Sequence, residues 1–480
     1  MKLLFEKGMP GAGTALLRQC GQGAAARLPE GYARSKPPAL PELAESEVSR
    51  HFSLLARRAF GVNNGFYPLG SCTMKYNPAM GEDAAGRPGF SGVHPLQPAR
   101  TVQGCLEVLY TAERGLCEIT GMDAMSFAPA AGAHGELAGI MMIKAYHASR
   151  GDAGRRVIIV PDSAHGTNPA SANMAGYDVV NLPSAQDGGI DVDKLRAIAG
   201  PDTAGLMLTN PNTLGLFEGR APEAAEIVHR AGGLMYYDGA NMNAIMGVSR
   251  PGDMGFDILH LNLHKTFAAP HGGGGPGSGP VGCKAEFARF LPPSGRAVER
   301  GSAFEWEEAG PQSIGRVSQF HGNFLVVVKA LAYLTALGAD GIAEASANAV
   351  LNANYLMHRL TEKYQAAYPG VCMHEFVLTL DELKKRTGAS ALDVAKAMMD
   401  SGMHPPTMYF PLIVHEALMF EPTETETKES LDNAADILLK LYDQAEMDPA
   451  PLFDAPLQTP VSRPDEAAAA RKLNLRYKYV

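Results

Sequence analysis

The sequence predicts an α/β protein whose main sheet is mostly parallel. Helix-like stretches such as PEAAEIVHRAG alternate with short apolar runs, and this alternation is typical of βαβ units. Each run is apolar almost throughout and ends in polar or glycine residues, as expected of strands that are buried on both faces and carry functional groups at their C-terminal ends. The four runs are VIIVP (157–161), AGLMLTNP (204–211), GLMYYDGAN (233–241) and DILHLNL (257–263).

The segments that flank these runs differ from them in character. The first 90 or so residues are rich in glycine, proline and turn-forming pairs, so we expect an extended arm there. From Thr101, TVQGCLEVLYTAERGLCEITG has apolar residues at helical spacing and ends on a glycine, which predicts a long helix. After FHGNFLVVVKALAYLTALGADG, helices lead into a second α/β segment. The predicted parts are an N-terminal arm (1–95), a large sheet domain (96–345) and a smaller C-terminal α/β domain (346–480).

Composition narrows the class of protein. The chain has 480 residues, of which 46% are hydrophobic, and this is enough for more than one buried core. A net charge of -9 argues against nucleic acid as a partner, because phosphate binding requires a basic face. Six cysteines without a CxxC pair fit a reducing cytoplasm. Glu6 and Lys7 interrupt the N-terminal apolar run, and no stretch of about 18 apolar residues occurs, so neither a signal peptide nor a membrane span is expected.

Two of the predicted turns could bind a planar phosphorylated cofactor. In PAAGAHGELAG (129–139), the small residues Ala131, Gly132 and Ala133 precede a helix, whose unpaired N–H groups would favour a phosphate. The segment lacks the GK[ST] ending of a P-loop, and a purely structural turn is the alternative. In VPDSAHGTNPASA, His165 follows a strand among small residues and could stack on a flat ring, or it could cap a helix or fill the core.

The next two strand ends carry charged residues. Asp238 follows the apolar strand of YYDGANMNA. An ionised carboxylate at this buried position requires a cation or a strong hydrogen-bond donor. The alternative is that Asp238 only caps a helix. Lys265 in HLNLHKTFAAPHGGGGPG follows the last run. Desolvation at the end of a buried strand favours the neutral form of the Lys265 amine, and a neutral amine is a nucleophile toward carbonyl groups. The glycines after it (272–275) allow a flexible loop or a backbone-lined pocket.

These four features occur in the order that pyridoxal 5'-phosphate requires. The helix start would hold the phosphate, the histidine would stack on the ring, the carboxylate would keep the ring nitrogen protonated, and the lysine would bind the aldehyde. The ordered set is more specific than any of its members. It predicts a pyridoxal-phosphate enzyme.

Long segments of the chain resemble glycine dehydrogenase (decarboxylating), the P-protein of the glycine cleavage system. Single-chain members are about twice as long as this chain, so it resembles the lysine-bearing half of the two-subunit type, subunit 2. The resemblance implies pyridoxal-phosphate fold type I, which is aspartate-aminotransferase-like. The segments that carry it are HLNLHKTFAAPHGGGGPGSGPVG, YPLGSCTMKYNP, HPLQPARTVQG, PAAGAHGELAG, HGTNPASANMAG, MLTNPNTLGLFE, YYDGANMNA, SIGRVSQFHGNF and HPPTMYFPLIVHEALMFEPTETETKESLD.

The resemblance also implies roles for individual residues. Lys265 would bind the cofactor covalently, Asp238 would pair with the pyridinium nitrogen, and His165 would stack on the ring. The remaining candidates are Ala131, Gly132 and Ala133 for the phosphate, Asn210 and Thr213 for the cofactor edge, His264 for the cofactor, and His94 and the Ser71–Cys72 segment for the substrate. Apart from the resemblance, His94, His264 and His271 could align a carboxylate or handle protons, because imidazole suits both tasks.

The activity implied is decarboxylation of glycine with transfer of the aminomethyl group to the lipoyl disulfide of the H-protein. The implied partners are subunit 1, with two copies of each subunit, and the lipoylated H-protein. We expect the N-terminal arm to wrap a partner subunit. The basic C-terminal RKLNLRYKYV could contact the carrier protein or be a packed or solvated tail.

Some positions depart from the family pattern, and other interpretations stay open. His134 and Leu137 stand where glutamine and an aromatic residue are usual, and Leu457 replaces a common histidine. His260 and His264 could suggest a metal pair, but i and i+4 lie far apart on a strand, so no metal site is expected. A serine hydroxymethyltransferase-like reaction or a transamination would use the same lysine and aspartate. A non-catalytic interaction subunit is the remaining alternative.

Overall fold

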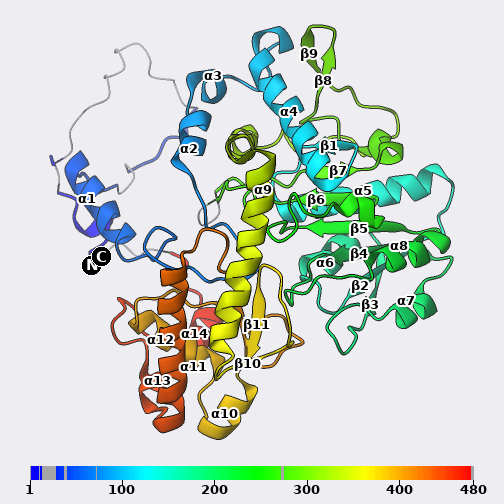
Figure 1. Ribbon diagram of the computed structural model, residues 1–480. Helices are drawn as coiled ribbons and strands as arrows, with labels where there is room; N and C mark the ends of the chain where they lie inside the picture. Colours follow the sequence, from blue (N-terminus) through cyan, green and yellow to red (C-terminus); the bar gives the residue numbers. More distant parts are fainter. Residues whose placement is uncertain are drawn as a thin grey trace. The chain divides into compact units, whose positions relative to one another are not determined.

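The computed structural model describes residues 2–9, 11–12, 29–36, 40–71, 73–271 and 275–476 (Figure 1). The chain divides into two compact units: Met1–Asn64 with Thr459–Val480, and Gly65–Gln458. In the first unit, the described residues form η1 (Leu4–Glu6), α1 (Glu45–Ala56) and α14 (Glu466–Arg471). Helix α1 buries His51 and leaves Phe52, Leu54 and Leu55 exposed, so it presents an apolar surface.

A seven-stranded sheet forms the centre of the second unit, in the order β1-β7-β6-β5-β4-β2-β3 (Figure 1). Strands β3, β2, β4, β5 and β6 run parallel, whereas β7 is antiparallel to β6 and β1. This confirms the mostly parallel sheet that the apolar runs predicted. The strands are β1 (Ala124–Ser126), β2 (Val157–Pro161), β3 (Asp178–Leu182), β4 (Thr203–Thr209), β5 (Leu234–Gly239), β6 (Ile258–Leu261) and β7 (Val281–Cys283).

Both faces of this sheet are buried. Successive side chains of a strand point to opposite faces, so Met235 and Tyr237 of β5 enter one core while Leu234 and Tyr236 enter another. The first core is closed by α4 (Gln103–Thr120), α7 (Val192–Ile198) and α8 (Ala221–Arg230), and the second by α5 (Gly132–Ser149) and α6 (Thr167–Met174). The long helix predicted after Thr101 is α4.

Shorter elements surround this sheet. Strands β8 (Ala297–Arg300) and β9 (Ala303–Trp306) form a separate antiparallel pair. Helix α2 (Ala79–Ala85) packs on α9, and α3 (Pro88–Ser91) follows it. The described residues of this unit also form three 3-10 helices: η2 (Ala99–Thr101), η3 (Pro251–Met254) and η4 (Ala285–Phe290).

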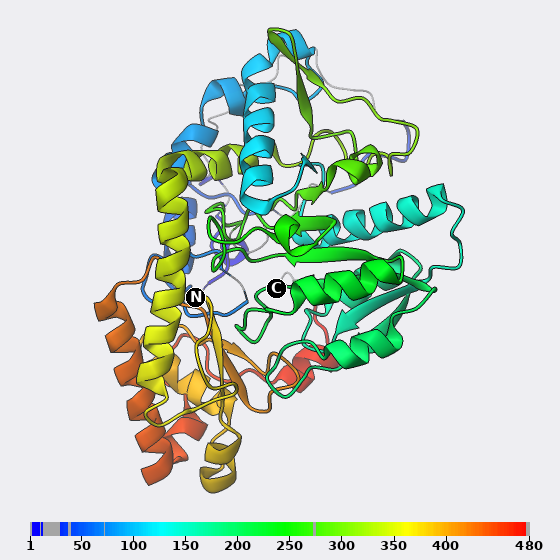
Figure 2. The same cartoon turned by 45° about the vertical axis from the view of Figure 1, so that its right-hand side comes forward.

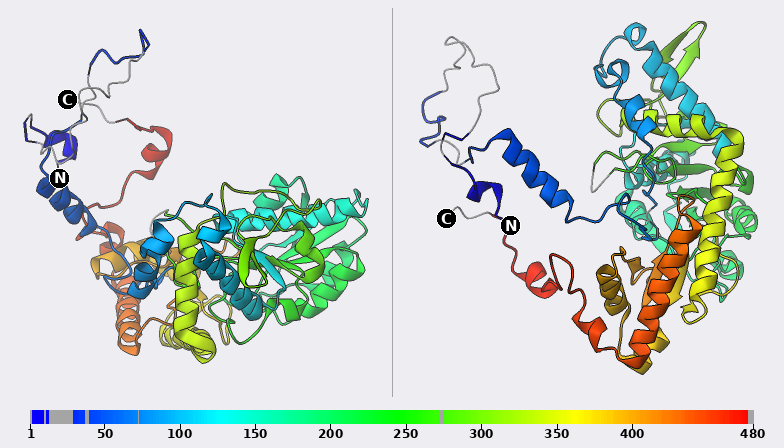
Figure 3. Two further views of the ribbon diagram at one scale, coloured as in Figure 1. Left: turned by 90° about the horizontal axis from the view of Figure 1, so that it is seen from above. Right: turned by 60° about the vertical axis from the view of Figure 1, so that its left-hand side comes forward.

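Helix α9 (Phe324–Leu360) joins the two cores of the second unit. Gly338 has φ 64° and ψ −177°, a conformation that side-chain-bearing residues rarely adopt, and the helix bends there (Figures 2 and 3). Before the bend, Val327 and Tyr333 pack into the large-sheet core, and after it Leu356 and Leu360 pack into the core of a smaller sheet. Among the described residues, α9 is the one helix long and apolar enough to cross a membrane. Its packing in two cores is that of a core helix. The boundary predicted at 345/346 lies within it and stays a prediction.

The smaller sheet is antiparallel, in the order β10-β11-β13-β12. Its strands are β10 (Gln365–Ala366), β11 (Phe376–Thr379), β12 (Thr407–Met408) and β13 (Ala417–Phe420), and its helices are α10 (Asp381–Thr387), α11 (Ala391–Asp400), α12 (Lys428–Met447) and α13 (Ala450–Asp454). An isolated bridge pairs Leu69 with Phe420 of β13. This bridge fixes the segment around Ser71 beside the smaller sheet.

Candidate active site

The C-terminal ends of β2, β4, β5 and β6 meet at one edge of the large sheet, beside a cavity of about 190 Å³. Parallel strands place their carboxyl ends at the same edge, which is why residues far apart in sequence converge here. The predicted site residues that line the cavity are Ser71, Gly132, Ala133, His165, Thr213, Asp238, His264 and Lys265. The structure therefore brings most of the predicted set together.

Lys265 lies in the turns that follow β6. Its Nζ donates a hydrogen bond to the carbonyl oxygen of Ser71, at 3.1 Å. Ser71 has φ 58°, which is uncommon for a residue with a side chain, and this conformation directs its carbonyl to the lysine. Lys265 is the only lysine or arginine among the described residues that line the cavity.

Asp238, at the end of β5, is 2% exposed and faces His260, its paired residue on β6. The distance from His260 Nε2 to Asp238 Oδ1 is 3.5 Å, and His260 Nδ1 lies 2.7 Å from the hydroxyl of Tyr236. Burial lowers the pKa of His260 to about 4, so its ring is neutral at neutral pH. Asp238 also accepts a hydrogen bond from the N–H of Ala240, at 3.0 Å. The N–H of Ala240 therefore fixes the carboxylate, and Nε2 of His260 lies beside it without a hydrogen-bond partner in the described part of the chain.

Glu136 is a second carboxyl group beside Asp238, and it was not predicted. It lies on the second turn of α5, inside the segment that was interpreted as a phosphate loop. Burial and the charge of Asp238 raise its pKa to about 9, so it is protonated at neutral pH. Glu136, Asp238 and His260 offer ligand atoms within 4.8 Å of one another, and His264 is not in this group.

His165 lies between β2 and α6, and its ring borders the cavity. Its Nδ1 is 2.7 Å from the hydroxyl of Thr167. Desolvation lowers the pKa of His165, Asp238 opposes this shift and Lys265 adds to it. Burial likewise lowers the pKa of His264 to about 4. Burial therefore favours the neutral form of both imidazoles.

The residues present fit pyridoxal phosphate. The first N–H groups of α5, from Gly132 and Ala133, have no acceptor within the helix and open into the cavity, which suits a phosphate. A Cβ at Gly132 would lie 2.3 Å from Oδ1 of Asn262, so glycine allows this side chain to approach the helix start closely. Oδ1 of Asn262 and Oγ1 of Thr209 border the cavity, are buried, and have no hydrogen-bond partner in the described part of the chain. A bound ligand would supply these partners.

Other predicted residues lie elsewhere. His94 lines a separate cavity of about 350 Å³, with Phe320 and Trp306, and does not border the one at Lys265. Asn210 exchanges hydrogen bonds with the backbone of Glu218, at 2.9 and 3.2 Å, and Asn212 lines the cavity in its place. Ala131 is the N-cap of α5 and does not line the cavity, and His271 packs edge-on against His264. Cys72 and Gly272–Gly274 lie outside the described residues.

The residues that depart from the family pattern have local contacts. The Nδ1 of His134 accepts a hydrogen bond from the N–H of Ala130, at 3.2 Å, just before α5. Leu137 packs against the core under α5. The N–H of Leu457 donates to the carboxylate of Asp400, and its side chain is exposed. None of these contacts involves a residue that lines the cavity.

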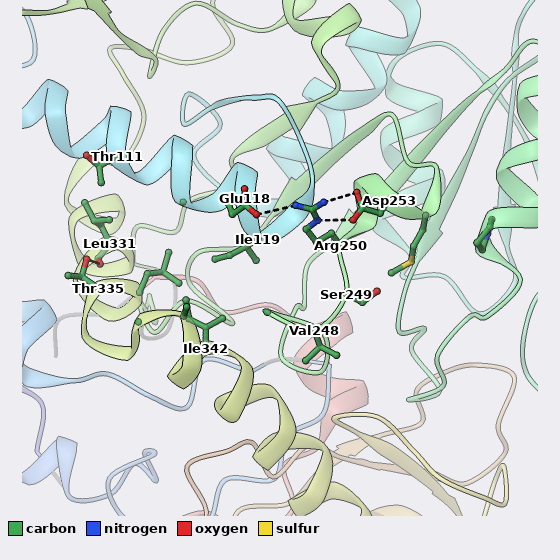
Figure 4. Close-up of a pocket in the computed structure, with 17 residues that line it drawn as sticks. Thr111, Glu118, Ile119, Val248, Ser249, Arg250, Asp253, Leu331, Thr335 and Ile342 are labelled. Atoms are coloured by element: carbon green, nitrogen blue, oxygen red, sulfur yellow. Dashed lines mark hydrogen bonds and ion pairs between the residues drawn. The ribbon is translucent and has the colours of Figure 1, made fainter.

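A larger hollow of about 870 Å³ lies apart from the strand ends, between α4, η3 and α9 (Figure 4). Arg250 forms ion pairs with Glu118 and Asp253 on its wall, and the other labelled side chains are mainly aliphatic. The described residues that line it include no lysine, histidine or cysteine.

Sequence reasoning missed Asn262, His374, Glu375 and Glu136, which all line the cavity. Glu136 and Asn262 lie within segments already singled out, so their positions after a helix start and a strand end were available signals. His374 and Glu375 come from the smaller sheet, and no spacing in the sequence connects them with the other strand ends.

Comparison with solved structures identifies the fold. The chain matches a "glycine decarboxylase (P-protein) of the glycine cleavage system" with a TM-score of 0.73 and 22% identity, over 86% of this chain and 93% of that one. It also matches a cysteine desulfurase from Escherichia coli with a TM-score of 0.61 and 16% identity, over 82% of this chain and 98% of that one. An aspartate aminotransferase from Thermus thermophilus matches with a TM-score of 0.56 and 16% identity, over 79% of this chain and 100% of that one. The chain has pyridoxal-phosphate fold type I, as predicted.

Comparison with curated sequences gives much closer matches. Proteins named "Probable glycine dehydrogenase (decarboxylating) subunit 2" are 57% identical in Treponema denticola, over 94% of both chains, and 55% identical in Desulforamulus reducens, over 98% of both. The relative from Listeria monocytogenes is 53% identical over 100% of this chain and 98% of its own length. A family model described as the glycine dehydrogenase C-terminal domain matches residues 345–450. The chain therefore belongs to the family of glycine dehydrogenase (decarboxylating) subunit 2 of the glycine cleavage system.

Proposed function

We propose that the chain decarboxylates glycine and transfers the remaining aminomethyl group to the lipoyl disulfide of the H-protein, as the lysine-bearing subunit of the P-protein. The observation that carries this proposal is the convergence of Lys265, Asp238, His165 and the start of α5 on one cavity. Family membership supports glycine as the substrate.

The same cavity offers a position for each part of pyridoxal phosphate. Lys265 would bind its aldehyde, Asp238 its ring nitrogen, and Gly132 and Ala133 its phosphate, while His165 would stack on the ring. When bound, pyridoxal phosphate accepts the electron pair of the bond that breaks at the α carbon of glycine. We further propose that Thr213 and His264 contact the cofactor, and that Asn212 takes the place expected for Asn210.

The chain's own groups account for orientation and charge. The N–H of Ala240 donates a hydrogen bond to Asp238, and the ring of His260 packs beside it, so the carboxylate has a fixed position. A preorganised charge in a site that excludes water stabilises a transition state more than a mobile one would. The neutral rings of His165 and His264 can donate hydrogen bonds without adding positive charge beside Lys265. The small volume of the cavity suits glycine, which has no side chain.

We propose subunit 1 and the lipoylated H-protein as partners, in an assembly with two copies of each subunit. The curated relatives are named "subunit 2", which supports subunit 1 as a partner. The N-terminal arm would contribute to the subunit interface, because α1 and the residues before it expose apolar side chains: Leu3, Phe5, Leu40, Phe52, Leu54 and Leu55. The cytoplasm is the proposed location.

The decisive experiment is to label Lys265. The chain is saturated with pyridoxal phosphate, reduced with borohydride and mapped by peptide mass. We expect the visible absorbance band and the label at Lys265, and loss of both in Lys265→Ala. Lys384→Ala, which removes an exposed lysine of α10, should keep them. Label on any other lysine would contradict the proposed role.

The reaction is tested with subunit 1 and lipoylated H-protein. Glycine-dependent exchange of labelled bicarbonate, with formation of a free thiol on the carrier, supports the proposal. A serine hydroxymethyltransferase-like enzyme would release formaldehyde equivalents from serine, and an aminotransferase would give a keto acid, without any change in the carrier. Absence of the band and of exchange in the full complex would favour an interaction subunit.

A further inference from the structure

Glu375 is a buried carboxyl group on the wall of the cavity that holds Lys265. It lies just before β11 of the smaller sheet and is 3% exposed. Its Oε2 accepts a hydrogen bond from the N–H of Ser71, at 2.7 Å, and the carbonyl of that same residue accepts one from Lys265. A single residue therefore joins the acid to the lysine.

The groups around Glu375 favour its protonated form. The carboxylate of Glu421, just after β13, acts on Glu375 through its charge, and it has a cation of its own: Lys75 Nζ lies 3.6 Å from its Oε2. Thr73 and Asn241 donate hydrogen bonds to the other oxygen of Glu421, at 2.5 and 2.9 Å. Two carboxyl groups that share one close cation in a buried site cannot both ionise readily.

The other neighbours of Glu375 do not reverse its preference for the protonated form. His374 Nε2 lies 3.7 Å from Oε1 of Glu375, and burial lowers the pKa of that histidine to about 4, so it supplies no positive charge at neutral pH. Burial first, and the charge of Glu421 second, raise the pKa of Glu375 to about 8, while Ser71, Lys75 and Lys265 oppose the shift. Oε2 accepts from the N–H of Ser71, so we assign the proton to Oε1.

The proposed reaction consumes one proton, and something in the cavity must deliver it. When carbon dioxide leaves, the electron pair of the broken bond stays with the aminomethyl carbon. That carbon forms a bond to one sulfur of the lipoyl disulfide, the S–S bond breaks, and the second sulfur leaves as a thiolate. The disulfide is reduced, the glycine carbon is oxidised, and the thiolate requires a proton to become a thiol.

We infer that Glu375 is the acid that protonates the departing sulfur, an inference that rests on the proposed function. The proton moves from Oε1 to the thiolate, and Glu375 becomes a carboxylate. That carboxylate then lies beside ionised Glu421 without a close cation of its own, so it takes up a proton again from water. Glu136 is the other protonated carboxyl group of the cavity, but it faces Asp238, at the ring-nitrogen end.

A first test detects the proton of Glu375 directly, in the full chain without cofactor. Infrared difference spectra taken across pH 8 report the C=O stretch of a protonated carboxyl group. We expect the wild type to lose a band with a midpoint near pH 8, and Glu375→Gln to lack this component. Glu424→Gln, which removes a half-buried carboxyl group outside the cavity, should retain it. A wild-type spectrum identical to that of Glu375→Gln would overturn the inference.

A second test measures transfer in the loaded complex with subunit 1 and lipoylated H-protein. In the wild type, formation of the carrier thiol should slow as pH rises through about 8, because Glu375 ionises. Glu375→Gln keeps an acceptor for Ser71 but holds no acidic proton, so we expect transfer at least tenfold slower and no such fall near pH 8. Label at Lys265 should be unchanged, and Glu375→Asp should restore part of the rate.

The outcomes separate the two proposals. A purely structural role for Glu375 predicts a wild-type rate and pH profile in Glu375→Gln, and this result would overturn the inference alone. A wild type that shows no glycine-dependent transfer at any pH would overturn the proposed function, while the infrared spectra would still report whether Glu375 holds a proton.

Discussion

Asp238 and His260 are paired residues on the neighbouring strands β5 and β6, and their side chains approach to 3.5 Å inside the protein. The hydroxyl of Tyr236, two residues before Asp238, lies against the far nitrogen of the same imidazole. The register of two parallel strands thus places three side chains in a row, with the carboxylate proposed for the ring nitrogen of the cofactor at its end. A shift of either strand by one residue would turn His260 to the opposite face.

Asp238→Asn should abolish most activity without loss of the fold. The amide has the shape of the carboxylate but no charge, so it cannot keep a ring nitrogen protonated. A loss of about 4 kcal/mol in transition-state stabilisation corresponds to roughly a thousandfold in rate. Glycine-dependent bicarbonate exchange measures the rate, and borohydride labelling at Lys265 shows whether the cofactor still binds.

The matched control for this variant is Asp257→Asn. Asp257 is also buried, and it accepts a hydrogen bond from the N–H of Met235 at the opposite end of the strands. This variant should reduce stability but leave the rate of the folded enzyme close to wild type. An equal loss of rate in both variants would show that the charge of Asp238 is not the cause of the loss in Asp238→Asn.

Gly132→Ala should weaken binding of pyridoxal phosphate. The new Cβ would lie 2.3 Å from Oδ1 of Asn262, so either this side chain, which borders the cavity, or the start of α5 must shift. Because the N–H groups of this turn are proposed to bind the phosphate, we expect an affinity at least tenfold lower, or about 1.4 kcal/mol. Titration of the visible band gives the dissociation constant.

Gly104→Ala controls for the general effect of alanine in a helix. Gly104 lies in α4, and a Cβ there would meet no atom within 4 Å. We expect unchanged affinity and a stability equal to or higher than that of the wild type, because alanine favours helix. Equal affinities in Gly132→Ala and the wild type would remove the start of α5 from the proposed phosphate site.

The sequence allowed the strand ends of the site to be predicted because parallel strands place their ends together. The run VIIVP is β2, and His165, Asp238 and Lys265 converge as expected. Strand β3 was not predicted, because it lies at the sheet edge and exposes Asp178 and Asn181, so its sequence is not an apolar run. Helix α1 was missed because its N-cap, Ala44, forms no side-chain cap.

Glu375 illustrates what the sequence could not provide. It reaches the cavity because Leu69 pairs with β13 and Ser71 then passes between the smaller sheet and Lys265. That contact depends on how two sheets pack, which no local pattern encodes. His94 shows the converse: its segment resembles the family closely, yet the structure places it in a different cavity. Its proposed contact with the substrate has no support from the geometry.

The protein should lose stability as pH falls from 6.5 toward 4, and His374 should be one cause. Burial lowers the pKa of His374 to about 4, whereas a histidine in the unfolded chain titrates near 6.5. Above pH 6.5 neither state binds the proton. Between 6.5 and 4 the unfolded state binds it and the folded state does not, so the free energy of unfolding decreases, by up to about 3 kcal/mol for this one group.

His374→Leu removes this contribution, and the unfolding midpoint should therefore depend less steeply on pH between 6.5 and 4. Some slope should remain, because the pKa values of His260 and His264 are shifted in the same direction. Differential scanning fluorimetry across this range gives the midpoints, and only their change with pH is compared, since leucine also alters packing. His358→Leu, at an exposed position of α9, should keep the wild-type slope. Parallel curves for His374→Leu and the wild type would mean that His374 is protonated in the folded protein at the same pH as in the unfolded chain.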